Sequence, residues 1–423
     1  MATPSLWRQR NFLLVLGGEV VNNIGDWLLA VALPAYVYTE TGSGTATAAI
    51  ALLELAVSIV FGPHAGALVD RWDLRRTVIA SNAAQAVTLL PLLAVDGDRI
   101  WPAWIVAVVQ GVIREVNNPA SFALVPRVVA AEDLTTANAI NGGAGSICRL
   151  VGAPLGGIAV AAGGLPAVVW ADGTTFLVVA VTTWFVRGAD TGPAVQPPAG
   201  TGGEPDAVDG REHGSGVRAG WRIVRRNPAL RGQLVVQTIA AFGFAMFPVL
   251  FIAFVVDVLG GDEATIGIIR GMAALGGIGA ALLVGKKARR VDPVWLMAAG
   301  FAGLGTVAFV FVNVSHATTA LWLYLVLFAL SGLPNITSEI GSTGATQRLC
   351  PSAVLGRFQG ISSALGAAAA LAATAATGVL VDHMPVRILL NVQAAVYVSA
   401  GVAAWLLVAR RRTDVAADAT VAA

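Results

Sequence analysis

Long apolar runs separated by short polar gaps recur along the whole chain. Each run has about 20 residues or more, the length that an α-helix needs to cross a bilayer. The runs are too long and too evenly apolar for the alternating strands of a membrane β-barrel. The pattern therefore predicts an all-α integral membrane protein with twelve transmembrane helices, at residues 12–38, 46–69, 77–95, 101–122, 136–162, 166–186, 231–257, 264–285, 293–313, 317–338, 353–381 and 386–409.

Basic residues collect in every second gap between these runs, and the intervening gaps contain only Arg99 and Arg387. Cytoplasmic loops of membrane proteins carry an excess of Lys and Arg. We therefore expect a multi-pass protein of the cell membrane with both termini in the cytoplasm. An even number of helices agrees with this topology, because it returns the chain to the side where it began.

A segment rich in Gly, Pro and acidic residues divides the chain into two halves. Such a composition cannot bury enough apolar surface to fold. Its end, residues 217–226, suits a short amphipathic helix on the anionic inner leaflet, although a basic flank for the next helix explains it equally well. We expect an N-terminal six-helix bundle at 1–187, a cytoplasmic linker at 188–228, a C-terminal six-helix bundle at 229–412 and a cytoplasmic tail at 413–423.

Composition narrows the possible functions. Hydrophobic residues make up 56% of the chain and charged residues 12%, whereas soluble domains have about 25% charged residues. No basic patch alternates with aromatic residues, so we expect no nucleic-acid partner. The two cysteines and four histidines show no metal-ligand spacing, and phosphate-binding loops and nucleophile motifs are missing from the sequence. We expect a non-enzymatic monomer without metal or cofactor, surrounded by the lipid bilayer.

Charged side chains inside transmembrane helices are costly, and they usually face a cavity, a partner or a transport pathway. On the first predicted helix, Glu19, Asn22, Asn23 and Asp26 recur at spacings of three and four residues, which places them on one face. We predict that Asp26 carries a proton or binds a cationic group, although a helix–helix hydrogen bond would also explain it. Glu54 is a second candidate proton carrier, unless solvent at the outer surface reaches it.

Basic groups lie on the fourth and fifth predicted helices. Arg114 requires a carboxylate partner at its depth, and Asp26 or Glu54 can supply it. Protonation would release that pair and bias the protein between two states, whereas a static ion pair is the alternative. Arg149 likewise needs an acid or an anionic ligand. We predict a cavity for protons and substrate lined by Asp26, Asn22, Asn23, Glu54, Arg114, Glu115, Asn118, Asn141 and Arg149.

The loop after the second predicted helix reads GALVDRWDLRR at residues 66–76. It resembles the signature loop of the major facilitator superfamily, although Asp73 stands where that loop usually has Gly and Leu74 where it usually has Arg. The resemblance implies a fold of two six-helix bundles, with a charge network that latches the two halves at the cytoplasmic side. It assigns to this cytoplasmic gate Gly66, Asp70, Arg71, Arg75 and Arg76.

The fifth predicted helix reads GAPLGG at residues 152–157. This stretch is similar to the Gly-Pro motif of exporters in the same superfamily, with the Pro displaced by one position. The motif residues are Gly152, Pro154, Gly156 and Gly157. With the Gly25-Asp26-Trp27 triplet they resemble the branch that contains macrolide efflux proteins and the enterobactin exporter, which implies drug:proton antiport.

Together, these features predict a secondary active transporter that exports an amphipathic small molecule, such as a drug or a secondary metabolite, in exchange for protons. Alternating access of a cavity between two halves would provide the mechanism. A solute importer or facilitator without proton coupling is the alternative. A membrane scaffold or receptor is disfavoured, because it has no need of charges inside the membrane.

Overall fold

The computed structural model describes residues 6–69, 71–130, 133–187, 221, 224–225, 227–288, 291–350 and 352–409. Within these ranges the regular elements are helices, and the only β contact is an isolated bridge between Asp96 and Arg99. The predicted all-α membrane fold is therefore confirmed. Nine of the described helices are long and apolar enough to cross a membrane, so the number of twelve remains a prediction.

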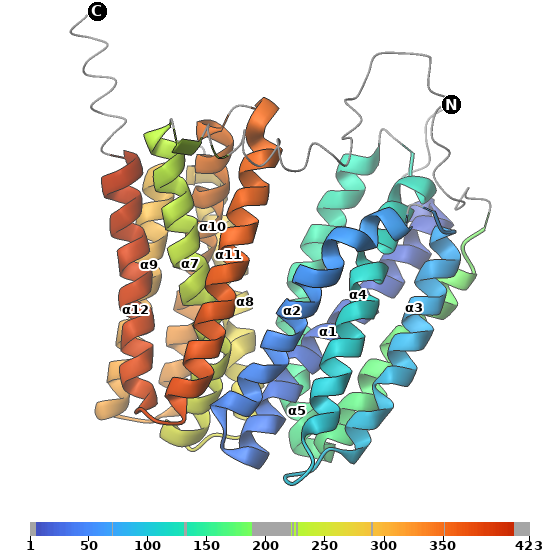
Figure 1. The fold of residues 1–423 in the computed structure, drawn as a ribbon, viewed down its shortest axis with the longest axis horizontal. Helices are drawn as coiled ribbons and strands as arrows, with labels where there is room; N and C mark the ends of the chain where they lie inside the picture. The colour runs from blue at the N-terminus through green and yellow to red at the C-terminus, as the bar shows by residue number, and fades with distance from the viewer. Residues whose placement is uncertain are drawn as a thin grey trace, which may run out of the picture. The chain divides into compact units, whose positions relative to one another are not determined.

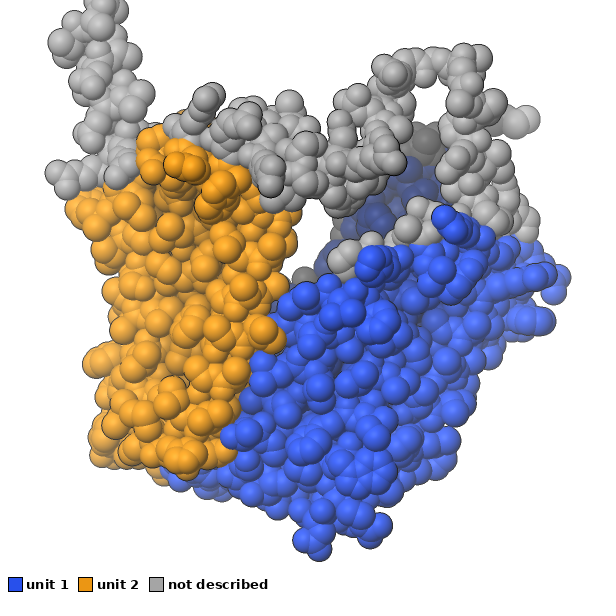
Figure 2. All heavy atoms as spheres, viewed as in Figure 1, with its two compact units in different colours: residues 1–197, 255–274 blue, residues 198–254, 275–423 orange. Residues whose placement is uncertain are grey.

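The chain forms two compact units, which Figure 2 shows in different colours. Unit 1 comprises residues 1–197 and 255–274, and unit 2 comprises residues 198–254 and 275–423. A segment from the predicted C-terminal bundle thus belongs to unit 1. The predicted tail at 413–423 and almost all of the predicted linker at 188–228 lie outside the described residues.

Five long helices form most of unit 1 (Figure 1). The fifth consists of two helical segments, because the backbone of Gly163 and Gly164 between them is not helical. Gly164 has a φ of +65°, which glycine adopts without steric cost. The break falls between the predicted helices at 136–162 and 166–186. The helices are α1 (Arg10–Thr41), α2 (Gly44–Val69), α3 (Leu74–Thr88), α4 (Trp101–Val128) and α5 (Leu134–Trp184).

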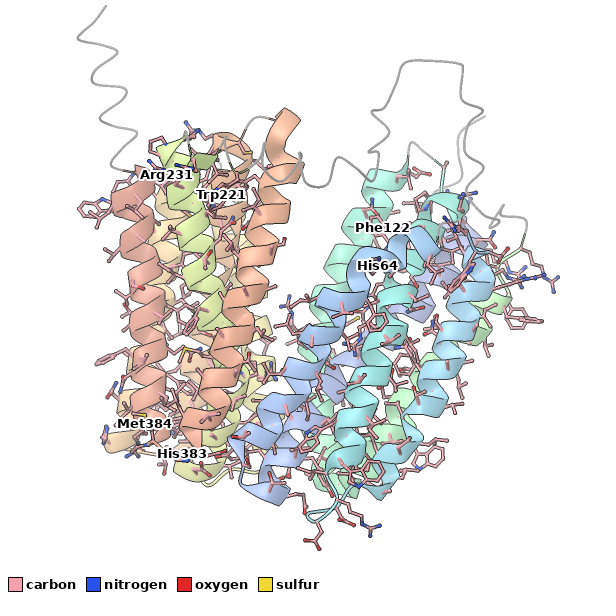
Figure 3. The ribbon with its side chains drawn as sticks, in the orientation of Figure 1. His64, Phe122, Trp221, Arg231, His383 and Met384 are labelled. Carbon is pink, nitrogen blue, oxygen red and sulfur yellow. The ribbon has the colours of Figure 1, made fainter. Side chains whose placement is uncertain are left out.

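Unit 2 is also helical, and Figure 1 shows α7, α11 and α12 side by side within it. Trp221 and Arg231 lie at one end of this unit, and His383 and Met384 lie at the other end (Figure 3). Helix α8 (Glu263–Ala288) begins in unit 1 and ends in unit 2. The other helices are α7 (Pro228–Ala253), α9 (Pro293–Asn313), α10 (Leu321–Leu349), α11 (Ser352–Val381) and α12 (Val386–Ala403).

Several helices are longer than the apolar runs that predict them. Helix α4 continues to Val128, whereas its run ends near residue 122, and α10 continues to Leu349, whereas its run ends near residue 338. The apolar run measures the part that can lie in hydrocarbon, whereas backbone hydrogen bonds extend a helix through polar residues as well. Hydropathy therefore locates these helices but not their ends.

Short polar side chains begin several helices, as capping chemistry predicts. Asp73, Asn227 and Asp292 each accept a backbone hydrogen bond at the start of α3, α7 and α9. At the start of α8, the Asp262 carboxylate accepts hydrogen bonds from both the hydroxyl and the backbone amide of Thr265. These hydrogen bonds lower the pKa of the Asp262 carboxyl group, because they stabilise its charged form.

Helices α1 and α5 approach each other closely through two glycines. A Cβ atom on Gly152 would lie 2.5 Å from the carbonyl oxygen of Ile24, and one on Gly156 would collide with the carbonyl oxygen of Leu28. Small residues permit such close contact between membrane helices. The position of α1 against α5 therefore depends on glycine at both sites.

We expect Gly156→Ala to destabilise the protein, because the new methyl group would meet α1 backbone that cannot rotate away. Overpacking of this kind costs about 1–3 kcal/mol. The matched control is Gly143→Ala in the same helix, where a Cβ would meet nothing within 4 Å. Thermal unfolding of both variants in detergent tests this, and equal transition temperatures would contradict the proposed contact.

Candidate functional site

A polar cavity of about 300 Å³ lies among α1, α3, α4 and the first segment of α5 in unit 1. Phe122, which is 75% exposed, also lines it (Figure 3). Residues outside the predicted set contribute further polar groups, namely Glu19, Gln85, Asn117, Ser121 and Cys148. The predicted site residues that line the cavity are Asn22, Asn23, Asp26, Arg114, Asn118 and Asn141.

The polar face predicted on α1 exists and faces this cavity. The Asn22 amide donates a hydrogen bond to Asp26 Oδ2 at 2.9 Å, one turn along the helix. The Asn23 amide donates to the carbonyl oxygen of Glu19 at 2.9 Å. Asp26 therefore has a neutral amide as its nearest partner on α1 and a carboxylate edge available to the cavity.

A second carboxylate, Asp172, lies beside this face. Its side chain has no exposed surface, and its Oδ2 has no hydrogen-bond partner in the described part of the chain. The Thr175 hydroxyl lies 3.2 Å from Asp172 Oδ1. A Cβ atom on Gly25 would collide with both Asp172 and Thr175, so glycine next to Asp26 lets α1 lie against this buried acid.

Arg114 pairs with Glu54, one of its two predicted partners. Arg114 Nη1 lies 3.7 Å from Glu54 Oε1, and the two side chains are 38% and 40% exposed. A distance of 3.7 Å exceeds that of a good hydrogen bond. The two charges therefore attract each other across a partly open space and are not locked together. Glu115, the neighbour of Arg114, lies instead against Gly62 of α2.

A buried amide cluster joins α3 to α4 beside the cavity. Asn117 Oδ1 accepts hydrogen bonds from the Ser81 hydroxyl at 2.7 Å and from the Asn82 amide at 3.0 Å. The Gln110 amide donates to the carbonyl oxygen of Gln85 at 2.9 Å. Buried polar groups need such partners, and this cluster fixes the α3–α4 wall of the cavity.

Arg149 was predicted to lie beside an acid or an anionic ligand. Its guanidinium group lies over the Trp27 ring, with 5.4 Å between Cζ and the ring centroid, and the anionic ligand remains a prediction. Arg149 does not line the cavity, and its side chain is exposed. The Trp27 ring can stabilise this guanidinium group through a cation–π interaction.

The predicted exporter motif packs on two helices at once. Gly152 and Gly156 face α1, as described above, whereas Gly157 and Pro154 face the beginning of α8. A Cβ atom on Gly157 would collide with the backbone of Glu263, and one on Gly271 would collide with the Pro154 ring. The motif is therefore a packing surface in unit 1, with no side chain that could perform chemistry.

Two hydrogen bonds from the end of α1 hold residues 255–274 in unit 1. The Tyr38 hydroxyl donates to Asp257 Oδ2 at 2.6 Å, and the Thr39 hydroxyl donates to Glu263 Oε1 at 2.5 Å. Hydrogen bonds to carboxylates are among the stronger ones in proteins. These four residues carry no distinctive signal in the sequence, because each lies at or near the end of an apolar run.

The residues of the predicted cytoplasmic gate are only partly described. Arg75 donates from Nε to the carbonyl oxygen of Thr183 at 3.2 Å and also donates to that of Trp184, whose ring lies 5.5 Å from its Cζ atom. Arg71 and Arg76 are exposed. Gly66 lies in α2, and Asp70 lies outside the described residues. A latch through Asp70 therefore remains a prediction.

Unit 2 contains a second polar cavity, of about 400 Å³, that the sequence analysis missed. Asn335, Ser338, Glu339 and Ser342 of α10 line it at spacings of three and four residues. This periodicity is a usable signal in the sequence, but Glu339 and Ser342 lie beyond the apolar run predicted at 317–338, and the other two residues are uncharged. The cavity also contains Phe244, Phe301 and the polar side chains of Gln237, Thr343, Gln359, Ser362 and Ser363.

We expect Asn117→Ala to destabilise unit 1, because it would remove the acceptor of two buried hydrogen bonds between α3 and α4. The Ser81 and Asn82 donors would keep only the carbonyl oxygen of Val78 within α3. The loss of one such hydrogen bond costs about 0.5–1.5 kcal/mol. Asn118→Ala is the matched control, because this neighbouring amide is exposed. Thermal unfolding of the two variants measures the difference, and an Asn117→Ala protein as stable as the control would show that the cluster contributes nothing.

Residues 15–374 match the family model described as Major Facilitator Superfamily. Macrolide efflux protein A of Streptococcus pyogenes is 24% identical over 302 residues, which cover 71% of this chain and 72% of that protein. The uncharacterized MFS-type transporter YfiS of Bacillus subtilis (strain 168) is 21% identical over 187 residues, 44% of each protein. The match to YfiS thus spans less than half the length of that relative.

Solved transporter structures share the fold. A bacterial homologue of the iron transporter ferroportin, in an inward-facing state, has a TM-score of 0.72 at 17% identity, and covers 95% of this chain and 98% of its own. The nucleoside transporter NupG has a TM-score of 0.74 at 10% identity, and covers 94% of this chain and 99% of its own. At these identities the similarity shows that the folds are alike and says nothing about the substrate of this chain.

Proposed function

Because the chain belongs to the Major Facilitator Superfamily, we propose that it exports an amphipathic small molecule in exchange for protons. Membership makes the chain a multi-pass membrane protein of a transporter family, whose members are in general not enzymes. The direction of transport, the coupling to protons and the substrate class form our proposal. We further propose a monomer in the cell membrane with both termini in the cytoplasm.

The observation that carries this proposal is the position of Asp26 in the wall of the unit 1 cavity. An ionised Asp26 would attract a cationic substrate, and a protonated Asp26 would not. Proton and substrate would therefore compete for one carboxylate, which is the simplest way to make their movements opposite. The Asn22 amide can donate to the carboxylate whether or not its other oxygen holds a proton.

Glu54 and Arg114 supply a second response to protonation in this proposal. Their separation of 3.7 Å and partial exposure allow water, and hence protons, to reach the pair. Neutralising Glu54 would leave the Arg114 charge without a partner in the cavity wall. That charge would repel a cationic substrate, so protonation at this pair would act in the same direction as protonation of Asp26.

Three further observations support the proposed export of an amphipathic compound. The GAPLGG motif contacts α1 and the beginning of α8, as a structural rather than a chemical element. The relatives named macrolide efflux protein A match over most of their length. Both cavities combine aromatic rings with hydrogen-bonding groups, which suits a ligand that is apolar over most of its surface and polar at a few points.

We predict that Asp26→Asn abolishes coupling to the proton gradient while the protein remains folded. With one-for-one exchange, one pH unit can sustain an about tenfold concentration ratio of substrate, and this ratio should fall to about one. The measurement is accumulation of cationic and neutral fluorescent dyes in proteoliposomes with and without an imposed gradient.

The control for this experiment is Glu40→Gln, which removes one carboxylate from the exposed end of the same helix. It should retain the full ratio. Undiminished gradient-driven export by Asp26→Asn would remove Asp26 from the mechanism. If neither the proton gradient nor a protonophore changes wild-type transport, the result would instead favour an uncoupled facilitator or importer.

We also predict that Glu339→Gln in the unit 2 cavity weakens binding of a cationic substrate about tenfold, the value of one charge-assisted hydrogen bond. A neutral dye of similar size should bind with unchanged affinity, because its contacts do not depend on the charge. Dye binding to purified protein provides the measurement, with Asp98→Asn in an exposed loop as the control. Equal losses for both dyes would indicate a general disturbance of the cavity.

A further inference from the structure

An open groove of about 630 Å³ lies between α3 and α4 on the outside of the amide cluster. Its walls include Ala80 and Ala84 of α3, which are exposed, and Val112, Ile113 and Val116 of α4. The two small alanines create its depth, because larger side chains at these positions would fill it. This part of the groove offers no charged side chain and is suited to a hydrocarbon chain.

One end of the same groove is strongly basic. Arg71 and Arg76 both line it and are exposed. Arg75, which lies between them in the sequence, instead donates hydrogen bonds to the carbonyl oxygens of Thr183 and Trp184. Within the described ranges, the guanidinium groups of Arg71 and Arg76 make no hydrogen bond or ion pair. Two such groups at the mouth of an apolar groove suit a phosphate.

Two further residues line this end of the groove, a tryptophan and an acidic residue. Trp72 lines the groove and is 42% exposed, and tryptophan is enriched where membrane meets water. The carboxylate of Asp73, the acidic residue of the lining, accepts a hydrogen bond from the Arg76 amide at 2.8 Å and caps α3. This interaction with the positive end of the helix reduces the repulsion of a nearby anion.

We propose that this groove binds an anionic phospholipid of the inner leaflet, with its phosphate on Arg71 and Arg76 and one acyl chain in the apolar part. The basic end and the apolar part of the groove follow one another along α3, as the headgroup and the acyl chain do in such a lipid. Ala84 is eight residues beyond Arg76, about 12 Å along the helix, so the chain would run beside α3 into the bilayer. Basic pockets between membrane helices on the cytoplasmic side are known to accept lipid headgroups.

This site is separate from the transport cavity and does not depend on proton coupling or on the substrate. A free phosphate would use only the basic end of the groove, whereas a phospholipid would use both parts. Binding of free phosphate and binding of a phospholipid can therefore be distinguished by changing the basic end and the apolar part of the groove separately.

The test is native mass spectrometry of the purified full-length protein, titrated with phosphatidylglycerol or with phosphatidylcholine of the same acyl chains. The wild type should bind phosphatidylglycerol in preference. The double variant Arg71→Gln/Arg76→Gln should bind it about thirtyfold more weakly, at about 1 kcal/mol for each basic residue near the surface. Its binding of phosphatidylcholine should not change.

The control Arg8→Gln/Arg231→Gln removes the same charge from exposed positions elsewhere and should leave phosphatidylglycerol binding intact. Ala84→Leu fills the apolar part without altering charge, and should weaken phosphatidylglycerol binding while the lipid preference of the remaining binding persists. An equal loss in the control, no loss in Arg71→Gln/Arg76→Gln, or no preference in the wild type would overturn the proposal. Unchanged phosphatidylglycerol binding by Ala84→Leu would also overturn the proposal. It would show that no acyl chain occupies the apolar part and that the basic end binds only the phosphate group.

Discussion

A charged or polar side chain among apolar helices is costly unless another polar group meets it. In unit 1 this constraint determines which helices face one another. Arg114 of α4 requires Glu54 of α2, and the Asn117 amide requires the donors of α3. The first pair attracts α2 to α4, and the second joins α3 to α4. The polar cavity lies beside these contacts, among α1, α3, α4 and the first segment of α5.

Much of this arrangement follows from the sequence. Apolar runs locate the helices, because hydrocarbon excludes unpaired backbone groups and only long helices satisfy them all. Helical periodicity places Glu19, Asn22, Asn23 and Asp26 on one face, and the structure turns that face to the cavity. The requirement of Arg114 for a carboxylate correctly restricts its partner to two residues, of which Glu54 is the one found.

What the sequence could not provide are the contacts that depend on how closely two helices approach. Arg149 was expected beside an acid or an anionic ligand, and its contact with the Trp27 ring depends on how α1 and α5 pack, which the apolar runs do not reveal. Asp172 gives no sign of its complete burial, since that depends on Gly25 allowing α1 to lie against it. The unit 2 cavity was missed because its lining is mostly uncharged, although Asn335, Ser338 and Ser342 share a helical face.

The packing of α5 joins these local features into a mechanism. Gly152 contacts α1 at Ile24 and Trp27, directly beside Asp26, so α1 and α5 have no free space in which to move independently. Five residues further along, Gly157 contacts the backbone of Glu263 at the start of α8. Tightly packed elements shift together rather than deform. A change in charge at Asp26 that displaces α1 must therefore displace α5, and α5 bears on the segment that Tyr38 and Thr39 hold by hydrogen bonds. In the proposed exchange mechanism, residues 152–157 would link the surroundings of Asp26 to the beginning of α8 by close packing, a role that requires small side chains and no reactive group.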